Sequence, residues 1–129
     1  MLPKELKYTL SHEWVRIRGR TAYIGLTEFA LEGLGKVLTL ELPNKDDELL
    51  VGIPLGDVET VDALHEITSP VEGLVAEVND AIFRNLDILL KDPYKRGWLI
   101  KVKLSAPLRI DSLLTAEEYL ARMQKKVKK

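Results

Sequence analysis

Apolar and polar residues alternate over several short stretches of this chain, and turn-forming residues separate these stretches. The alternation covers residues 14–18, 21–25, 36–42 and 98–104, with Gly19 after the first stretch and Pro43 after the third. Successive side chains of a β-strand point to opposite faces of a sheet, so this period of two predicts strands with one buried face. Many short strands with frequent turns predict a mainly β fold, a sandwich or flattened barrel of antiparallel sheets.

The middle of the chain continues the same pattern. A loop leads into a strand that begins near Ile53, and two further strands are expected around residues 57–61 and 63–69. Residues 70–73 (PVEG) then turn the chain into a strand at 74–78. This order predicts an antiparallel hairpin whose tip lies near residue 62.

Three segments have helical features. Thr27 can cap a short helix over residues 27–34 that ends at Gly35, and the apolar residues of 79–90 have helical spacing. Thr115 and Glu118 form a capping box that opens a C-terminal helix at about 115–127. Leu120, Met123 and Val127 are spaced for one face of that helix. The expected fold is therefore mainly β, with short helices and one C-terminal helix.

Length and residue usage limit the classes of protein. The 129 residues suit a single domain over 1–129 with one core. Because the chain has no cysteine and only two histidines, thiol catalysis, disulfides and thiolate metal sites are excluded. Neither a membrane-spanning apolar run nor a signal-peptide core is found, so we expect a cytoplasmic protein that does not contact membranes.

Charge is distributed unevenly. Residues 121–129 carry five cations and no acid, whereas the other 120 residues carry 14 cations and 20 acids. No Lys or Arg occurs from Asp46 to Phe83, although this stretch has ten acids. Such a segment repels nucleic acid, so the expected partners are proteins with basic docking surfaces.

Nine short motifs together resemble the H protein of the glycine cleavage system, a relative of the lipoyl and biotinyl carrier domains. They extend from about Lys7 to Arg122, in the order and at the spacing of that family. The motifs are YTLSHEWVR (8–16), IGLTEFA (24–30), LG (34–35), ELP (41–43), GDVETV (56–61), SPVEG (69–73), EVN (77–79), DPY (92–94) and GWLIKV (97–102). The resemblance implies a lipoyl-type sandwich and a carrier that is not an enzyme.

The resemblance also implies where the carrier chemistry would lie. In the family, a lysine at a hairpin tip is joined by an amide bond to lipoate, which carries an aminomethyl group between the enzymes of glycine cleavage. The family hairpin reads approximately Val-Glu-Ser-Val-Lys-Ala, and this chain has Val-Glu-Thr-Val-Asp-Ala at 58–63. The lysine position therefore falls on Asp62, flanked by Glu59, Thr60, Val61 and Ala63. Aspartate has no amine, so lipoate cannot be attached there and no cofactor is predicted.

Several interpretations of Asp62 follow. The chain is a natural paralogue that has lost the attachment, or it carries a deliberate substitution, or Asp62 has chemistry of its own. We favour the first, a non-lipoylated binding, scaffold or regulatory protein that docks on lipoyl-handling enzymes as a monomer. The alternative is a working glycine-cleavage carrier modified at another lysine, although the nearest lysine on each side of Asp62 in the chain, Lys45 before it and Lys91 after it, lies far outside the hairpin.

A metal site on the hairpin is a further alternative. Asp62, His65 and Glu66 are potential ligands for a divalent metal, but alternating strand residues point to opposite faces, which opposes convergence. The simpler interpretation has Asp62 and Glu66 as solvated acids and His65 as a surface residue, so no metal is predicted. The resemblance also implies a cleft that holds the loaded arm, with Ser11, Glu13 and Glu66 at the matching positions.

Overall fold

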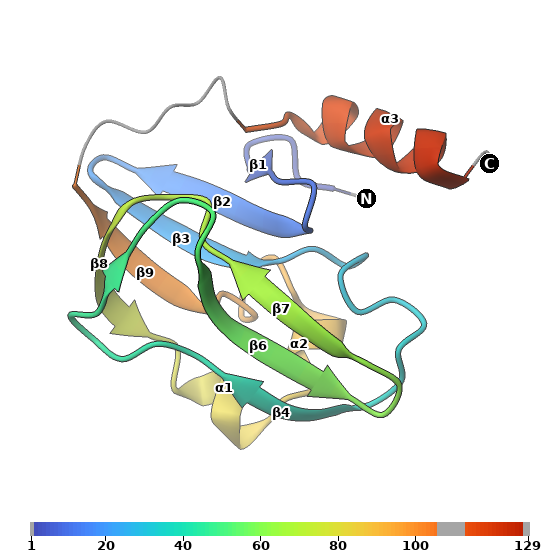
Figure 1. Ribbon diagram of the computed structural model, residues 1–129, viewed down its shortest axis with the longest axis horizontal. Helices are drawn as coiled ribbons and strands as arrows, with labels where there is room; N and C mark the ends of the chain where they lie inside the picture. The colour runs from blue at the N-terminus through green and yellow to red at the C-terminus, as the bar shows by residue number, and fades with distance from the viewer. Residues whose placement is uncertain (1, 106–112, 128–129) are drawn as a thin grey trace.

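Two antiparallel sheets face each other in the computed structural model, which describes residues 2–105 and 113–127 (Figure 1). The six-stranded sheet has the order β1 (Lys7–Tyr8), β2 (Glu13–Arg18), β3 (Thr21–Leu26), β9 (Ile100–Leu104), β8 (Gly73–Val78) and β5 (Glu48–Leu49). The three-stranded sheet has the order β4 (Val37–Glu41), β6 (Pro54–Thr60) and β7 (Leu64–Thr68). The predicted sandwich of antiparallel sheets is confirmed, as a flattened sandwich of two sheets and not a closed barrel.

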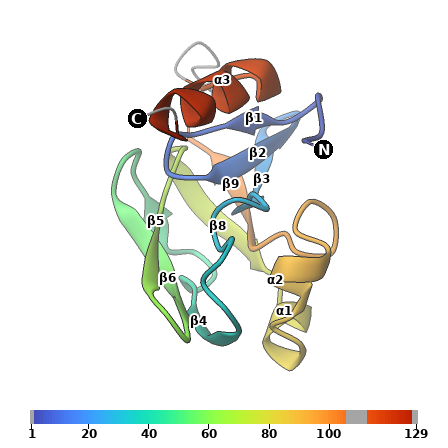
Figure 2. The same cartoon turned by 90° about the vertical axis from the view of Figure 1, so that its right-hand side faces the viewer.

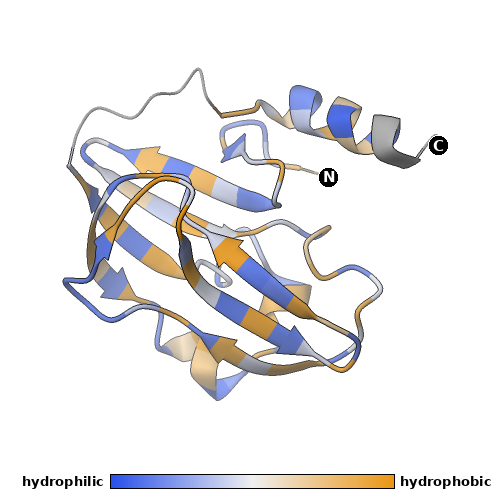
Figure 3. Ribbon diagram, viewed as in Figure 1, coloured by the Kyte–Doolittle hydropathy of each residue, from blue (hydrophilic) through white to orange (hydrophobic). Residues whose placement is uncertain are grey.

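The main core lies between the two sheets and is built from the apolar positions of the alternating stretches. Val15, Ala22 and Val102 from the six-stranded sheet are buried in one cluster with Val58 and Ile67 from the three-stranded sheet. Apolar and polar residues alternate along the strands in Figure 3. Each sheet therefore keeps one face for the core and leaves a second, outer face.

The C-terminal helix α3 (Ala116–Val127) covers part of the outer face of the six-stranded sheet, over β1 and β2 (Figure 2). Its capping box is formed: the Thr115 N–H donates to Glu118 Oε1 over 2.9 Å, and the Glu118 N–H donates to Thr115 Oγ1 over 3.1 Å. The Tyr119 ring stacks on Tyr8 with 5.2 Å between ring centroids. Leu120 and Met123 pack on the same cluster, while the side chain of Val127 lies outside the described part of the chain.

The predicted helix over residues 27–34 is wrong, because the structure has turns there. The Ala30 N–H donates to the Thr27 carbonyl and the Leu34 N–H to the Leu31 carbonyl, both three residues back. Thr27 Oγ1 accepts the Phe29 N–H, which is a side-chain turn and not a helix cap. Glycines with positive φ at Gly33 and Gly35 keep the chain turning until β4 begins.

Residues 79–90 form two one-turn helices, α1 (Ala81–Arg84) and α2 (Ile88–Lys91), where one helix was expected. Asn85 interrupts the segment, since it has φ −156° and its Oδ1 accepts the Asp87 N–H. Strand β5 lies in a segment predicted as a loop. Among the described residues, no helix is long and apolar enough to span a membrane.

Candidate functional site

The tip of the β6–β7 hairpin is a tight turn formed by Thr60, Val61, Asp62 and Ala63. The Thr60 N–H donates to the Ala63 carbonyl over 2.8 Å. The buried Thr60 hydroxyl accepts the N–H groups of Asp62 and Ala63 over 3.3 and 3.1 Å, and donates to the Ala63 carbonyl over 3.1 Å. One side chain therefore fixes the turn, and the Val61 and Asp62 side chains are left exposed.

The tip also rests on the turn that precedes β4. The Val61 N–H donates to the Lys36 carbonyl over 3.0 Å, and the Asp62 N–H donates to the Leu34 carbonyl over 3.3 Å. A Cβ atom placed on Gly35 would lie 3.2 Å from Asp62 Oδ2, so the carboxylate lies against this glycine. These contacts hold the tip in one orientation and place the exposed Lys36 beside it.

Acidic side chains form a row across the outer face of the three-stranded sheet. The strand register places Glu41 opposite Asp57, and Asp57 opposite Glu66. Glu59 follows Asp57 by two residues along β6, so it lies on the same face and nearer the hairpin tip. Its Oε1 accepts a hydrogen bond of 3.3 Å from the Thr39 hydroxyl. We call Glu41, Asp57, Glu59 and Glu66 the acidic face. Like charges directly opposite each other are destabilising, so this row is not explained by stability.

A buried carboxylate, that of Glu13, lies at the start of β2, on the core side of the sheet. Glu13 is 1% exposed, and its Oε1 accepts hydrogen bonds from Thr9 Oγ1 over 2.7 Å and Ser11 Oγ over 2.8 Å. Its Oε2 accepts the Thr68 N–H of β7 over 3.3 Å, which links the two sheets. Three donors thus satisfy a carboxylate that would otherwise be costly to bury.

His65 lies on the inner face of β7, opposite Val58 of β6. It is half-buried, so its interpretation as a surface residue is wrong; its Nε2 is buried and has no hydrogen-bond partner. Burial lowers the pKa of His65 below its usual 6.5, and the carboxylate of Glu13 partly opposes that shift. The imidazole is therefore neutral at pH 7.

The structure brings some of the predicted residues together and separates others. Ser11 and Glu13 are hydrogen-bonded, whereas Glu66 is exposed in the acidic face and no hydrogen bond among the described residues joins it to them. Within the described ranges, no three His, Asp or Glu side chains converge as a metal site, and His65 points away from the face that holds Glu66.

Sequence reasoning missed two contacts of Glu13. The contact with the Thr9 hydroxyl was detectable from the sequence, because Thr9, Ser11 and Glu13 stand at every second position of the run TLSHE. Side chains at every second position of an extended segment point to the same side. The contact with the Thr68 N–H was not detectable from the sequence, because this is a backbone group whose position depends on how the two sheets pack.

Comparison with known proteins gives a consistent result. The family model described as "Glycine cleavage H-protein" matches residues 6–126. A glycine cleavage system H protein of Acaryochloris marina is 42% identical over 122 residues, which are 95% of each chain. One from Carboxydothermus hydrogenoformans is 40% identical over 119 residues, 92% of each chain.

The solved structures agree with the sequence comparison. The crystal structure of a glycine cleavage system H protein from Mycobacterium marinum has a TM-score of 0.86 and 31% identity, and the match covers 95% of this chain and 99% of that one. H proteins are lipoyl carriers and not enzymes, in agreement with the expectation that this chain is not an enzyme. The match over nearly the whole chain, in both sequence and fold, shows that this chain belongs to the glycine cleavage H-protein family.

Proposed function

We propose that this protein is a docking member of the H-protein family that carries no lipoyl group on its hairpin. The observation that carries the proposal is the carboxylate of Asp62, exposed at the hairpin tip where the family resemblance places the lipoyl lysine. Acylation by lipoate needs a primary amine, which Asp62 lacks. The tip is otherwise intact, since the turn is closed by Thr60 and anchored by Val61. A partner that recognises the hairpin would therefore still find it.

The docking surface combines charge with exposed apolar side chains. Val61 is 63% exposed and Leu64 is 64% exposed, and both lie at the tip end of the acidic face. An apolar centre bordered by carboxylates fits a partner whose apolar pocket is surrounded by Lys and Arg. Enzymes that handle lipoyl groups are the partners that the family relationship suggests, and the protein would act on them as a scaffold, decoy or regulator.

Binding measurements against the purified lipoyl-handling enzymes of the same cell test this proposal. We expect the association rate to fall as salt rises, because exposed charges are screened beyond about 10 Å at 0.1 M ionic strength. The double variant Glu59→Gln/Glu66→Gln should bind more weakly, and Glu5→Gln/Glu72→Gln, which removes the same charge at exposed positions elsewhere, should bind like the native protein. No binding to any of these enzymes, or equal loss in both variants, would refute the proposal.

A carrier modified at another lysine is the second candidate, and Lys36 is the lysine that the contacts of the tip favour for it. Lys36 is far from the hairpin in sequence, but its carbonyl accepts the Val61 N–H, so its exposed side chain begins beside the tip. Lys45 lies beyond the other end of β4. Intact mass and peptide mapping after incubation with a lipoate ligase separate the two candidates. An acyl group on Lys36 would support the carrier, and an unmodified chain supports the docking protein.

A further inference from the structure

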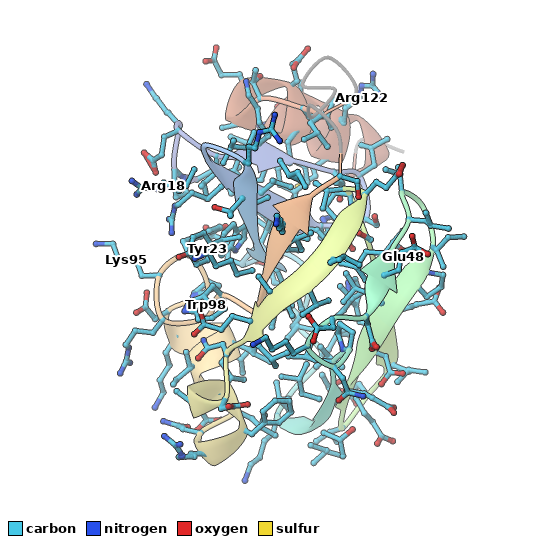
Figure 4. The ribbon with its side chains drawn as sticks, turned by 90° about the vertical axis from the view of Figure 1, so that its left-hand side faces the viewer. Arg18, Tyr23, Glu48, Lys95, Trp98 and Arg122 are labelled. Atoms are coloured by element: carbon cyan, nitrogen blue, oxygen red, sulfur yellow. The ribbon has the colours of Figure 1, made fainter. Side chains whose placement is uncertain are left out.

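The outer face of the six-stranded sheet has the opposite charge from the acidic face. The strand register puts Arg16, Tyr23 and Lys101 in one row across β2, β3 and β9, and Arg18, Thr21 and Lys103 in the next. Trp98 lies beside Tyr23, with the two rings in edge-to-face contact at 5.4 Å between centroids. We call Arg16, Arg18, Tyr23, Trp98, Lys101 and Lys103 the basic–aromatic face. Figure 4 shows Arg18, Tyr23 and Trp98 on the same side of the molecule.

Aromatic rings hold two of these cations in place. Lys101 Nζ lies 5.7 Å from the centroid of the Tyr23 ring. The Arg16 guanidinium lies 5.3 Å from the centroid of the Trp14 ring, and its Nη2 donates to the Tyr94 carbonyl over 2.9 Å. Side chains that are already ordered lose less conformational entropy when a ligand binds.

Within the described part of the chain, none of the cations of this face forms an ion pair with a carboxylate. Among the described residues the one ion pair is Arg96 with Asp92, which lies outside the face. Arg18 and Lys103 are exposed. Four cations on one sheet face, with Glu77 opposite Lys101 only at its β8 border, attract a negatively charged ligand.

We propose that the basic–aromatic face binds a short acidic segment of a second protein. Carboxylates in such a segment would pair with Arg18 and Lys103, and an apolar or aromatic residue would contact the Tyr23 and Trp98 rings. The face ends at β8, where Glu77 lies opposite Lys101, and Glu48 of β5 follows beyond. A long polyanion such as nucleic acid would extend over these acids and be repelled, whereas a short segment stays on the cations.

The two charged faces lie on opposite sides of the sandwich, because the core that joins Val15, Val102 and Val58 lies between the sheets. Partners bound to the two faces would therefore not collide. The protein would act as an adaptor that joins a basic partner to an acidic one. This bridging role rests on the proposed docking through the acidic face, whereas binding of an acidic segment does not.

Fluorescence anisotropy with a labelled octaglutamate peptide carrying one central tyrosine tests the inference. We expect binding that weakens about tenfold or more in the Arg18→Glu/Lys103→Glu variant and is retained in Arg18→Lys/Lys103→Arg. The variant Arg84→Glu/Lys91→Glu makes the same charge change on the exposed ends of α1 and α2, and should bind like the native protein. Circular dichroism confirms that each variant is folded.

Three results would overturn the inference. They are equal loss of peptide binding in both charge-reversal variants, tighter binding of a single-stranded oligonucleotide of the same charge, and association of the chain with itself that the peptide does not displace. The acidic-face variant Glu59→Gln/Glu66→Gln should still bind octaglutamate. If the protein binds the peptide but does not dock on the enzymes, the proposed function alone is refuted. If it docks on the enzymes but does not bind the peptide, this inference alone is refuted.

Discussion

Asp57 lies directly opposite Glu66 across the β6–β7 pair, and Glu41 lies opposite Asp57 on its other side. Three carboxylates in one cross-strand row repel one another, and no Lys or Arg occurs in the 46–83 segment to offset them. A surface retained at a cost in stability is more readily explained by binding than by folding.

Replacing the central acid of this row should stabilise the protein. Asp57→Lys converts two repulsive pairs into two attractive ones, and we expect the free energy of unfolding to rise by about 0.5–1 kcal/mol. Urea denaturation measures this change. Glu72→Lys, the same charge change at an exposed turn, should have a smaller effect. Unchanged or reduced stability of the Asp57 variant would show that the row does not repel.

Restoring an amine at the tip should restore acylation. Asp62→Lys places a primary amine on an exposed turn whose hydrogen bonds come from the backbone and Thr60, so the turn should persist. We expect a lipoate ligase to modify residue 62, seen as a mass increase of the hairpin peptide, and stability to change by less than about 0.5 kcal/mol. Asp62→Gln, which has no primary amine, is the control. A folded Asp62→Lys variant that stays unmodified would show that the hairpin has diverged beyond one side chain.

Loss of the Thr60 hydroxyl should loosen the tip. Thr60→Val keeps the shape but leaves the Asp62 and Ala63 N–H groups without their acceptor, and we expect a loss of about 1–3 kcal/mol. Thr60→Ser retains the hydroxyl and should lose less. Chemical denaturation gives the free energies, and amide exchange of residues 61–63 should accelerate only in the valine variant. Equal stability of the valine variant and the native protein would mean that other contacts close the turn.

His65 should make stability depend on pH in the acidic range. Its pKa is lowered in the folded state, chiefly by burial, so below 6.5 the unfolded chain binds more protons than the folded one. Stability contributed by the neutral imidazole is therefore lost as pH falls below 6.5. Thermal denaturation of the native protein and of His65→Gln between pH 7.5 and about 5 should show a larger decrease for the native protein. Parallel curves would contradict this assignment.

The strands were predictable because apolar and polar residues alternate along them, as the burial of Ile100 and Val102 in β9 shows directly. Strand β2 departs from this pattern, because Glu13, Trp14 and Val15 at its start are all buried. The apolar positions of these strands predict the core, and their basic positions are the cations of the basic–aromatic face. Asp62 at the tip followed from the order of the family motifs around it.

Where the sequence misled, contacts between distant segments decide the structure. Gly33 and Gly35 allow the turns that carry the chain past the hairpin tip, which no local pattern indicates. The amide of Asn79 donates to the Arg96 and Trp98 carbonyls, which ties the start of the 79–90 segment to a loop near β9. The burial of His65 follows from its register against Val58, and sequence alone does not give that register.

The opposite charges of the two outer sheet faces have a consequence for how encounters begin. Charges of opposite sign on opposite faces contribute a dipole component across the sandwich, and the field of a charged partner exerts a torque on this component before contact. The protein would approach a basic partner with its acidic face already turned toward that partner. It would approach an acidic partner with its basic–aromatic face turned toward it. A larger fraction of collisions would then lead to a complex. Added salt would lower the association rate constant more than it raises the dissociation rate constant.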